Sequence, residues 1–107
     1  MRAIRLLPEY GACPIWLYDA TGDLLANDLP PELKAVPEIV AQVGQIQDIF
    51  NSLYRDDPHV FEWIGFTNPE DREKYVALVR SAIALIKSTV GDRYDFRDDS
   101  DLDQFYR

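Results

Sequence analysis

Two amphipathic segments limit the folds open to this chain more than any other feature of its sequence. In both segments apolar residues recur at steps of three and four, which places each set on one face of an α-helix. The first set is Val36, Ile39, Val40, Val43, Ile46, Phe50 and Leu53. The second set is Tyr75, Val76, Val79, Ala82, Ile83, Ile86 and Val90. Each helix needs a second layer against which it can bury its apolar face.

Residues that favour helix ends mark the limits of both helices. Asn68 suits the N-cap of the second helix and Pro69 its first position. Gly91 suits the left-handed residue that follows the last turn. Pro37 divides the first region into a short turn after Pro30 and a longer helix. We therefore expect two main helices, with a small extra turn before the first.

Five short segments rich in β-favouring residues supply the second layer. They are residues 3–7, 14–19, 24–27, 59–66 and 92–97. Asp19 and Gly22 lie between the second and third segments and predict a hairpin turn. Residues 59–66 are largely apolar on both alternating faces, which predicts a central position in the sheet. A helix separates them from residues 92–97, so we expect these two strands to run parallel.

Together these elements predict an α+β fold: a single mixed, mostly antiparallel sheet of four to five strands with two helices on one face. The domain is expected to span residues 1–97. Residues 98–107 are rich in aspartate and are expected to form an acidic, mobile C-terminal tail, whose aromatic residues could dock on the domain. This tail lacks the glycine and glutamate spacing of a calcium-binding loop, so no metal site is predicted there.

The charge balance excludes whole classes of partner. Nineteen Asp and Glu oppose eleven Lys and Arg, giving a formal net charge of −8, whereas nucleic-acid binding needs clustered cations. No apolar run approaches the length of a membrane span, and the N-terminal residues lack a secretory core. We therefore expect a cytoplasmic protein with no nucleic-acid or membrane partner.

Signals for catalysis and for cofactors are weak. The sequence contains no P-loop, no dinucleotide-binding glycine motif and no nucleophile elbow. One Cys and one His exclude a cysteine zinc cage and a multi-histidine metal site. Cys13 and His59 could act as nucleophile and base, but a buried thiol and a surface histidine are more common. We predict a protein without enzymatic activity or cofactor, with a small enzyme as the less favoured alternative.

Aromatic side chains predict a binding face on the sheet. Strand alternation groups them on one side, and this side lies opposite the helices if the aliphatic faces pack on the helices. The rings concerned are Trp16, Tyr18, Phe61 and Trp63, joined by Tyr94 and Phe96 of the last strand. Exposed aromatic surface marks interaction sites. Burial of the same face under residues 10–13 or the tail would instead make it a second small core, and both interpretations are open.

Carboxylates near these rings favour a basic protein as the partner, because complementary charge speeds encounter and disfavours other partners. The predicted partner-binding residues are Trp16, Tyr18, Asp56, Asp57, Phe61, Glu62 and Trp63. Asp56 and Asp57 also suit a turn, where they need no role in binding. The aromatic face could instead join two copies in a homodimer, as in a self-associating regulatory or structural subunit.

Part of the sequence resembles small bacterial proteins. The residues that carry the resemblance are Leu7–Trp16, Tyr18–Asp19 and Asn27–Pro30. In size and charge the chain is similar to the acidic immunity proteins that accompany polymorphic toxins and contact-dependent inhibitors. The resemblance implies a single domain that binds and blocks a cognate toxin. Immunity families share no common residue signature, so it assigns no functional residue.

Overall fold

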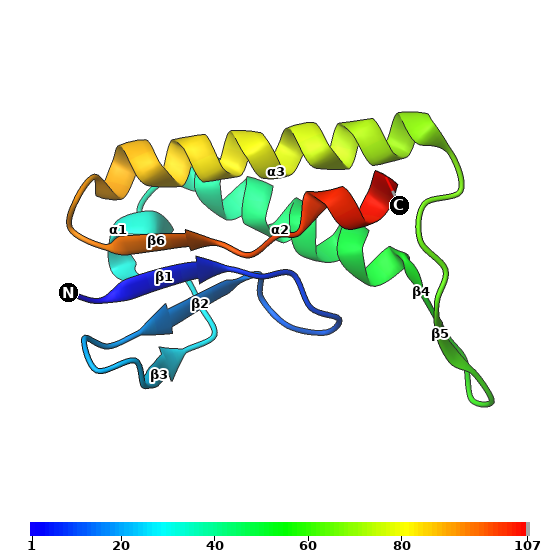
Figure 1. The fold of residues 1–107 in the computed structure, drawn as a ribbon, viewed down its shortest axis with the longest axis horizontal. Helices are drawn as coiled ribbons and strands as arrows, with labels where there is room; N and C mark the ends of the chain where they lie inside the picture. The colour runs from blue at the N-terminus through cyan, green and yellow to red at the C-terminus, as the bar shows by residue number, and fades with distance from the viewer. Residues whose placement is uncertain (107) are drawn as a thin grey trace.

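The computed structural model describes residues 1–106 and shows an α+β fold with two separate sheets (Figure 1). The larger sheet contains β1 (Ala3–Leu6), β2 (Ile15–Tyr18), β3 (Leu24–Ala26) and β6 (Asp95–Asp98). The smaller sheet contains β4 (Tyr54–Asp56) and β5 (Phe61–Trp63). The helices are α1 (Pro31–Lys34), α2 (Pro37–Ser52), α3 (Pro69–Val90) and the terminal 3-10 helix η1 (Leu102–Tyr106). The predicted fold class is confirmed.

The larger sheet has the strand order β3-β2-β1-β6. β1 pairs antiparallel with β2, and β2 with β3, while β1 and β6 run parallel. This is a mixed, mostly antiparallel sheet of four strands, as the sequence predicts. The parallel partner of β6 is β1, however, so the expected parallel pairing of residues 59–66 with residues 92–97 is wrong.

Residues 59–66 do not lie in the larger sheet at all. Only Phe61–Trp63 forms a strand, and it pairs with Tyr54–Asp56, which precedes it closely in the chain. A hairpin of this kind closes a very short loop, so it loses less chain entropy than a strand inserted among distant neighbours. The predicted central position is therefore wrong, because apolar alternation indicates a strand without indicating its partner.

One layer of apolar side chains joins the larger sheet to the helices. The sheet contributes Ile4, Leu6, Ile15 and Leu17 to this core. The helices contribute most of the two predicted stripes, including Ile39, Val43, Ile46, Phe50, Val79, Ala82 and Ile86. Figure 1 shows α2 and α3 on the same side of the larger sheet, as predicted. Val40 is the exception within the stripes, because its side chain is exposed.

The predicted helix ends are confirmed at α3. The Asn68 side chain accepts a hydrogen bond from the Asp71 N–H at 2.8 Å, which satisfies one of the unpaired donors of the first turn. Gly91 follows the last turn with φ of +58°, a region that glycine reaches without a Cβ clash. Pro37 begins α2 after the short helix α1, as the sequence predicts.

The C-terminal residues pack along the rest of the chain. β6 continues to Asp98, one residue beyond the expected domain boundary, and η1 occupies much of the expected tail. The Phe105 ring lies 5.2 Å from Phe66 and 5.4 Å from Tyr75, measured between ring centroids. The predicted mobility of this acidic segment stays a prediction, but its aromatic residues have a docking place beside α3.

Candidate protein-interaction surface

The β4–β5 hairpin projects from the body of the molecule (Figure 1). Its register pairs Tyr54 with Trp63, Arg55 with Glu62 and Asp56 with Phe61. Side chains of paired residues share a face, and neighbours along a strand lie on opposite faces. One face therefore carries three aromatic rings and Asp56, whereas Arg55 and Glu62 lie on the other. The prediction that Phe61 and Trp63 share a face is confirmed.

The rings of the hairpin belong to a larger aromatic cluster at this end of the molecule. Neighbouring ring centroids in the cluster lie 4.9 to 6.0 Å apart, a range typical of favourable aromatic pairs. The members of the aromatic cluster are Tyr10, Phe50, Tyr54, Phe61, Trp63, Phe66, Tyr75 and Phe105. They come from the β1–β2 loop, α2, the hairpin, the loop between β5 and α3, α3 itself and η1, so the cluster joins segments that are distant in sequence.

The aromatic cluster has a buried base and an exposed rim. Phe50 and Tyr75 are buried, and burial raises the pKa of Tyr75. Phe61 is 56% exposed, Trp63 is 43% exposed and Tyr10 is 39% exposed. Large rings that stay this open normally mark a contact surface. Because each of them packs on another ring of the cluster, little side-chain freedom is lost when a partner binds.

A groove of about 550 Å³ lies between the hairpin and the β1–β2 loop, and we call it the Tyr10 groove. Its lining residues are Pro8, Glu9, Tyr10, Phe50, Tyr54, Phe61 and Gln104. The Tyr10 hydroxyl donates a hydrogen bond of 2.7 Å to Oδ2 of Asp56. This hydrogen bond raises the pKa of Tyr10. It also links the loop to the hairpin across the groove.

The β1–β2 loop (residues 7–14) is held in place at both its base and its tip. At the base, the Leu7 N–H donates to the Pro14 carbonyl at 2.8 Å. At the tip, the Gly11 N–H donates to Oδ1 of Asn51 at 2.9 Å, where Gly11 has φ of +72°. Tyr10, which precedes this glycine, is thereby directed at the hairpin.

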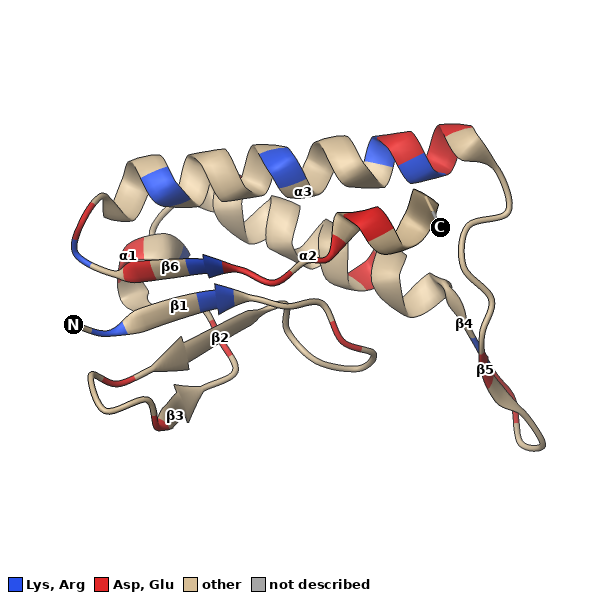
Figure 2. Ribbon diagram, viewed as in Figure 1, with Lys and Arg blue, Asp and Glu red and all other residues tan. Residues whose placement is uncertain are grey.

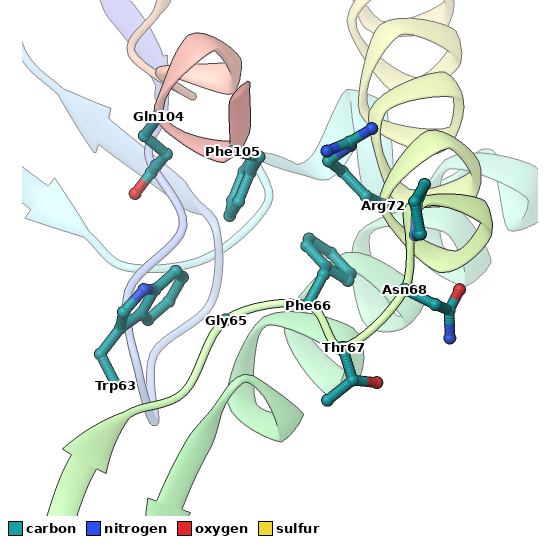
Figure 3. A pocket seen from close by; sticks show the side chains of 9 residues that line it. Trp63, Gly65, Phe66, Thr67, Asn68, Arg72, Gln104 and Phe105 are labelled. Carbon is teal, nitrogen blue, oxygen red and sulfur yellow. The ribbon is translucent and has the colours of Figure 1, made fainter. Parts of the chain in front are cut away.

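A second pocket, of about 310 Å³, lies on the other side of Trp63. Figure 3 shows Trp63 and Phe66, from the end of β5 and the loop after it, and Phe105 of η1 around this pocket. Arg72 of α3 also lines this pocket, and its guanidinium carbon lies 4.5 Å from the centroid of the Tyr106 ring. A cation of the chain itself thus lies against an aromatic face beside this pocket, although Tyr106 is not one of its lining residues.

The three carboxylates predicted to bind a partner have different positions. Asp56 lies on the aromatic face, beside Tyr10. Glu62 lies on the opposite face, where Nη1 of Arg55 is 3.4 Å from its Oε1. Figure 2 shows that acidic residues also follow β6 and that one lies in the β1–β2 loop, where the sequence has Glu9. The surroundings of the aromatic cluster are thus acidic, although only Asp56 of the three lies on the aromatic face of the hairpin.

Asp57 closes the hairpin turn. Its Oδ1 accepts from the N–H groups of His59 and Val60 at 2.8 and 2.9 Å, and Nε of Arg55 lies 3.1 Å from its Oδ2. The backbone hydrogen bonds from His59 and the Arg55 contact lower the pKa of Asp57. The two-residue loop Pro58–His59 is bracketed by hydrogen bonds between the backbones of Asp57 and Val60. This is the turn role that its sequence position suggests.

Trp16 and Tyr18 lie on the larger sheet, apart from the hairpin. Both are half-buried. Nε1 of Trp16 donates to the Leu7 carbonyl at 2.9 Å, and hydrogen bonds to Tyr18 and Asp99 raise the pKa of Arg5. The idea that one sheet face carries all four predicted rings is therefore wrong. The structure brings Phe61 and Trp63 together and leaves Trp16 and Tyr18 on a separate, charged face.

The last strand also differs from the prediction. Phe96 is opposite Ile4 in the register, so it lies on the side of the larger sheet that faces the helices. The Lys87 ammonium lies 5.9 Å from the centroid of the Phe96 ring. Tyr94 is buried as part of the main core. Neither ring joins an exposed aromatic face.

Cys13 and His59 lie in different surroundings. Cys13 is half-buried in the β1–β2 loop, where Asn27 bonds to its backbone N–H and carbonyl. Burial raises the pKa of the Cys13 thiol, so the thiol is protonated and weakly nucleophilic at neutral pH. His59 is exposed in the hairpin turn. Nothing in these contacts activates the thiol.

Sequence reasoning missed Tyr10, Tyr54 and Phe105 as members of the surface. For Tyr54 a signal existed: the alternation Tyr54–Asp56 leads into Asp57–Pro58, a turn pair followed at once by another β segment. For Tyr10 and Phe105 no local signal existed, because both reach the hairpin only through the tertiary fold.

Within residues 1–106, no group of three or more His, Cys, Asp and Glu side chains is arranged to hold a metal ion. In the same part of the chain, no helix has both the length and the apolar character needed to cross a membrane. Comparisons with protein-family models and with curated proteins find no match. The functional inference therefore depends on the geometry of the surface.

Proposed function

We propose that this chain is a protein-binding module that docks on a basic protein through the aromatic face of its β4–β5 hairpin. One observation carries the proposal: Phe61 and Trp63 are about half exposed although each packs on another ring, Trp63 on buried Phe50 and Phe61 on half-buried Tyr54. Aromatic anchors with packed support are the residues that dominate protein–protein binding energies. Exposed rings lower the solubility of the free chain, and their exposure is explained if a partner covers them.

The charge of the molecule supports a basic partner. The formal net charge is −8, and Glu9 and Asp56 adjoin the exposed rings. An acidic rim around aromatic anchors attracts a positively charged protein and repels acidic ones. Asp57 and Glu62 each have an ion-pair contact with Arg55. They therefore add negative charge near the surface without being placed to contact the partner.

Within this class, we propose that the chain acts as an immunity-type inhibitor that blocks a basic toxin by direct contact. The support is the resemblance of its sequence to small acidic immunity proteins, together with a surface suited to a basic protein. Inhibition of this kind needs only an occluding complex, so the inhibitor requires no catalytic group of its own. We place the complex in the cytoplasm.

Affinity capture followed by a direct binding measurement tests the proposal. The immobilised chain is compared with the Phe61→Ala/Trp63→Ala double variant, and the protein that only the first retains is identified and purified. We expect that protein to be basic and to bind with an affinity that falls as salt rises. Leu24→Ala is the matched control, because Leu24 is equally exposed but lies in β3 of the larger sheet.

The hairpin also provides the observation that favours a second candidate, self-association. Its two strands pair only with each other, so each keeps an outer edge without a strand partner within residues 1–106. Two copies could pair along such an edge and cover both aromatic faces. Sedimentation of the isolated chain distinguishes the candidates. A tight dimer that Trp63→Ala dissociates would assign the aromatic face to self-association.

A further inference from the structure

We propose that the Tyr10 groove is a receptor site for one arginine side chain of the basic partner. The inference rests on the proposed function, and it names the group that the partner must present at this point. The groove offers a guanidinium two binding features, accessible ring faces and nearby carboxylates. Its lining residues include no cation that would compete for them.

The walls of the groove are ordered aromatic rings. The Tyr54 and Phe61 rings are nearly parallel, with an interplanar angle of 7° and centroids 5.2 Å apart. The Tyr10 ring meets the Phe61 ring edge-on at 4.9 Å. Phe50 lines the inner part of the groove and is buried. These mutual contacts fix the rings, while Phe61 and Tyr10 keep open surface for a ligand.

Carboxylates adjoin the rings. Glu9 lines the groove, and its side chain is exposed beside Tyr10. Oδ2 of Asp56 accepts a hydrogen bond from the Tyr10 hydroxyl. A carboxylate has further lone pairs, which can accept hydrogen bonds from a guanidinium as well. None of the lining residues is a lysine or an arginine. A cation from outside therefore meets negative charge and aromatic faces in the same place.

The same chemistry is satisfied from within the chain at Arg72, which lines the second pocket and contacts two residues outside that lining. There the Arg72 guanidinium lies over the Tyr106 ring, and Nε of Arg72 is 3.4 Å from Oε1 of Glu73. The Tyr106 hydroxyl also donates to Glu73 at 2.9 Å. An arginine on a tyrosine ring with a neighbouring glutamate is thus an arrangement that this fold uses. In the Tyr10 groove the ring and the glutamate are present and the arginine is not.

The geometry favours arginine over lysine. A planar guanidinium can lie flat on a ring and still donate in its own plane to carboxylates at the edge. A lysine ammonium is compact and more strongly hydrated, so it gains less from an open aromatic wall. The aromatic wall and neighbouring carboxylate of the Tyr10 groove therefore predict a preference for arginine, with lysine weaker.

The test uses small probes, so it does not depend on knowing the partner. The isotopically labelled full chain is titrated with N-acetyl-arginine methylamide and, separately, with the lysine and citrulline equivalents, while NMR follows the aromatic and backbone signals. We expect saturable shifts centred on Tyr10, Tyr54 and Phe61. The arginine probe should bind roughly three- to thirtyfold more tightly than the neutral citrulline probe, with lysine between them.

Three variants locate the site. Phe61→Ala should abolish the saturable shifts, and Glu9→Gln should weaken arginine binding severalfold without disturbing the fold, because Glu9 is exposed. Leu25→Ala, on exposed β3 of the larger sheet, should bind the probe like the unaltered chain. Backbone signals of the core residues show in each variant whether the chain is folded.

Failure of this inference is distinguishable from failure of the proposed function. Equal binding of arginine and citrulline, or shifts centred away from the groove, would overturn the arginine site. If that result occurs while Trp63→Ala still abolishes binding of the captured partner, the proposed function stands and only the arginine site falls. If the probe binds in the groove but the partner binds the double variant normally, the proposed function falls.

Discussion

At the scale of single residues, exposure separates supporting rings from contact rings within one aromatic cluster. Phe50 is only 6% exposed and belongs to the main core, whereas Phe61 is 56% exposed on the hairpin. The two rings have the same chemistry, so their different burial assigns them different tasks. Phe50 stabilises the fold, and Phe61 offers surface to a partner.

Alanine substitutions at these two positions should therefore have unequal effects on stability. We expect Phe50→Ala to lower the free energy of unfolding by about 3 to 5 kcal/mol, the usual cost of emptying a core site. Phe61→Ala should lower it by less than about 1 kcal/mol, because most of its ring is already in water. Urea unfolding of both variants measures the difference. A similar loss for the two would place Phe61 in a core.

Asp57 predicts how the hairpin responds to acid. Its pKa is lowered by hydrogen bonds from the His59 backbone and by Arg55. A lowered pKa means that the charged form stabilises the folded hairpin, fully above the ordinary aspartate value of 3.8 and decreasingly as the pH falls through the folded-state pKa. We expect the NMR signals of residues 54–63 to keep their hairpin dispersion at the ordinary aspartate value of 3.8 and to lose it only as the pH falls below that value.

Asp57→Asn is the matched control for this acid response. An asparagine side chain keeps an oxygen acceptor for the two N–H groups of the turn but loses the charge that Arg55 contacts. In this variant the hairpin signals should be weakened already at neutral pH and should change less on acidification. An unchanged acid response in Asp57→Asn would show that other carboxylates cause it.

At the scale of elements, the projecting hairpin depends on three segments that contact it from outside. α2 provides Phe50, whose ring centroid lies 5.8 Å from those of both Tyr54 and Trp63. The β1–β2 loop provides Tyr10, and η1 provides Phe105, whose ring lies 6.0 Å from the Trp63 ring. A two-stranded hairpin alone is marginally stable in water. Its aromatic face is therefore ordered by packing on α2, the β1–β2 loop and η1, not by a larger sheet.

Phe105→Ala tests this dependence. The ring contacts Trp63, Phe66 and Tyr75, so its removal should cost about 2 kcal/mol of stability, less than a fully buried phenylalanine. The signals of Trp63 should also broaden as its support is lost. Thermal unfolding and the indole NMR signal measure both effects. No change in either would mean that the C-terminal residues are a mobile tail in solution.

Local signals made the helices and most strands predictable from sequence. Asn68 and Pro69 fix where α3 begins, and Pro37 fixes where α2 begins. Each of these signals depends only on neighbouring residues. For the hairpin, the turn pair Asp57–Pro58 is a local signal, but the apolar segment that follows it favours the wrong partner. The alternation of residues 59–66 indicates a strand, but it carries no information on whether the partner strand lies next to it or far away.

At the scale of the whole molecule, the candidate surface was predicted only in part. Phe61 and Trp63 were identified because strand alternation places them on one face. Trp16 and Tyr18 were wrongly joined to them, because a sequence does not show that its strands divide between two sheets. The contribution of the β1–β2 loop depends on contacts between residues some forty positions apart, such as Gly11 with Asn51.

The net charge of the molecule leads to a prediction for binding kinetics. With a formal net charge of −8, association with a basic partner should be accelerated by long-range attraction. We expect the association rate to fall by roughly tenfold or more between low and physiological salt, with a much smaller change in the dissociation rate. Surface plasmon resonance at several salt concentrations measures both rates. An association rate that does not depend on salt would contradict the proposal that charge attracts the partner.

The measurement closest to the centre of this account compares what Trp63 does for binding with what it does for folding. For Trp63→Ala we predict an affinity for the captured partner reduced by about thirtyfold or more, with a loss of only about 1 kcal/mol in the free energy of unfolding. Calorimetric titration and urea unfolding on the same samples give both values. A variant that binds normally, or whose loss of binding is matched by its loss of stability, would contradict the assignment of the hairpin as a docking surface.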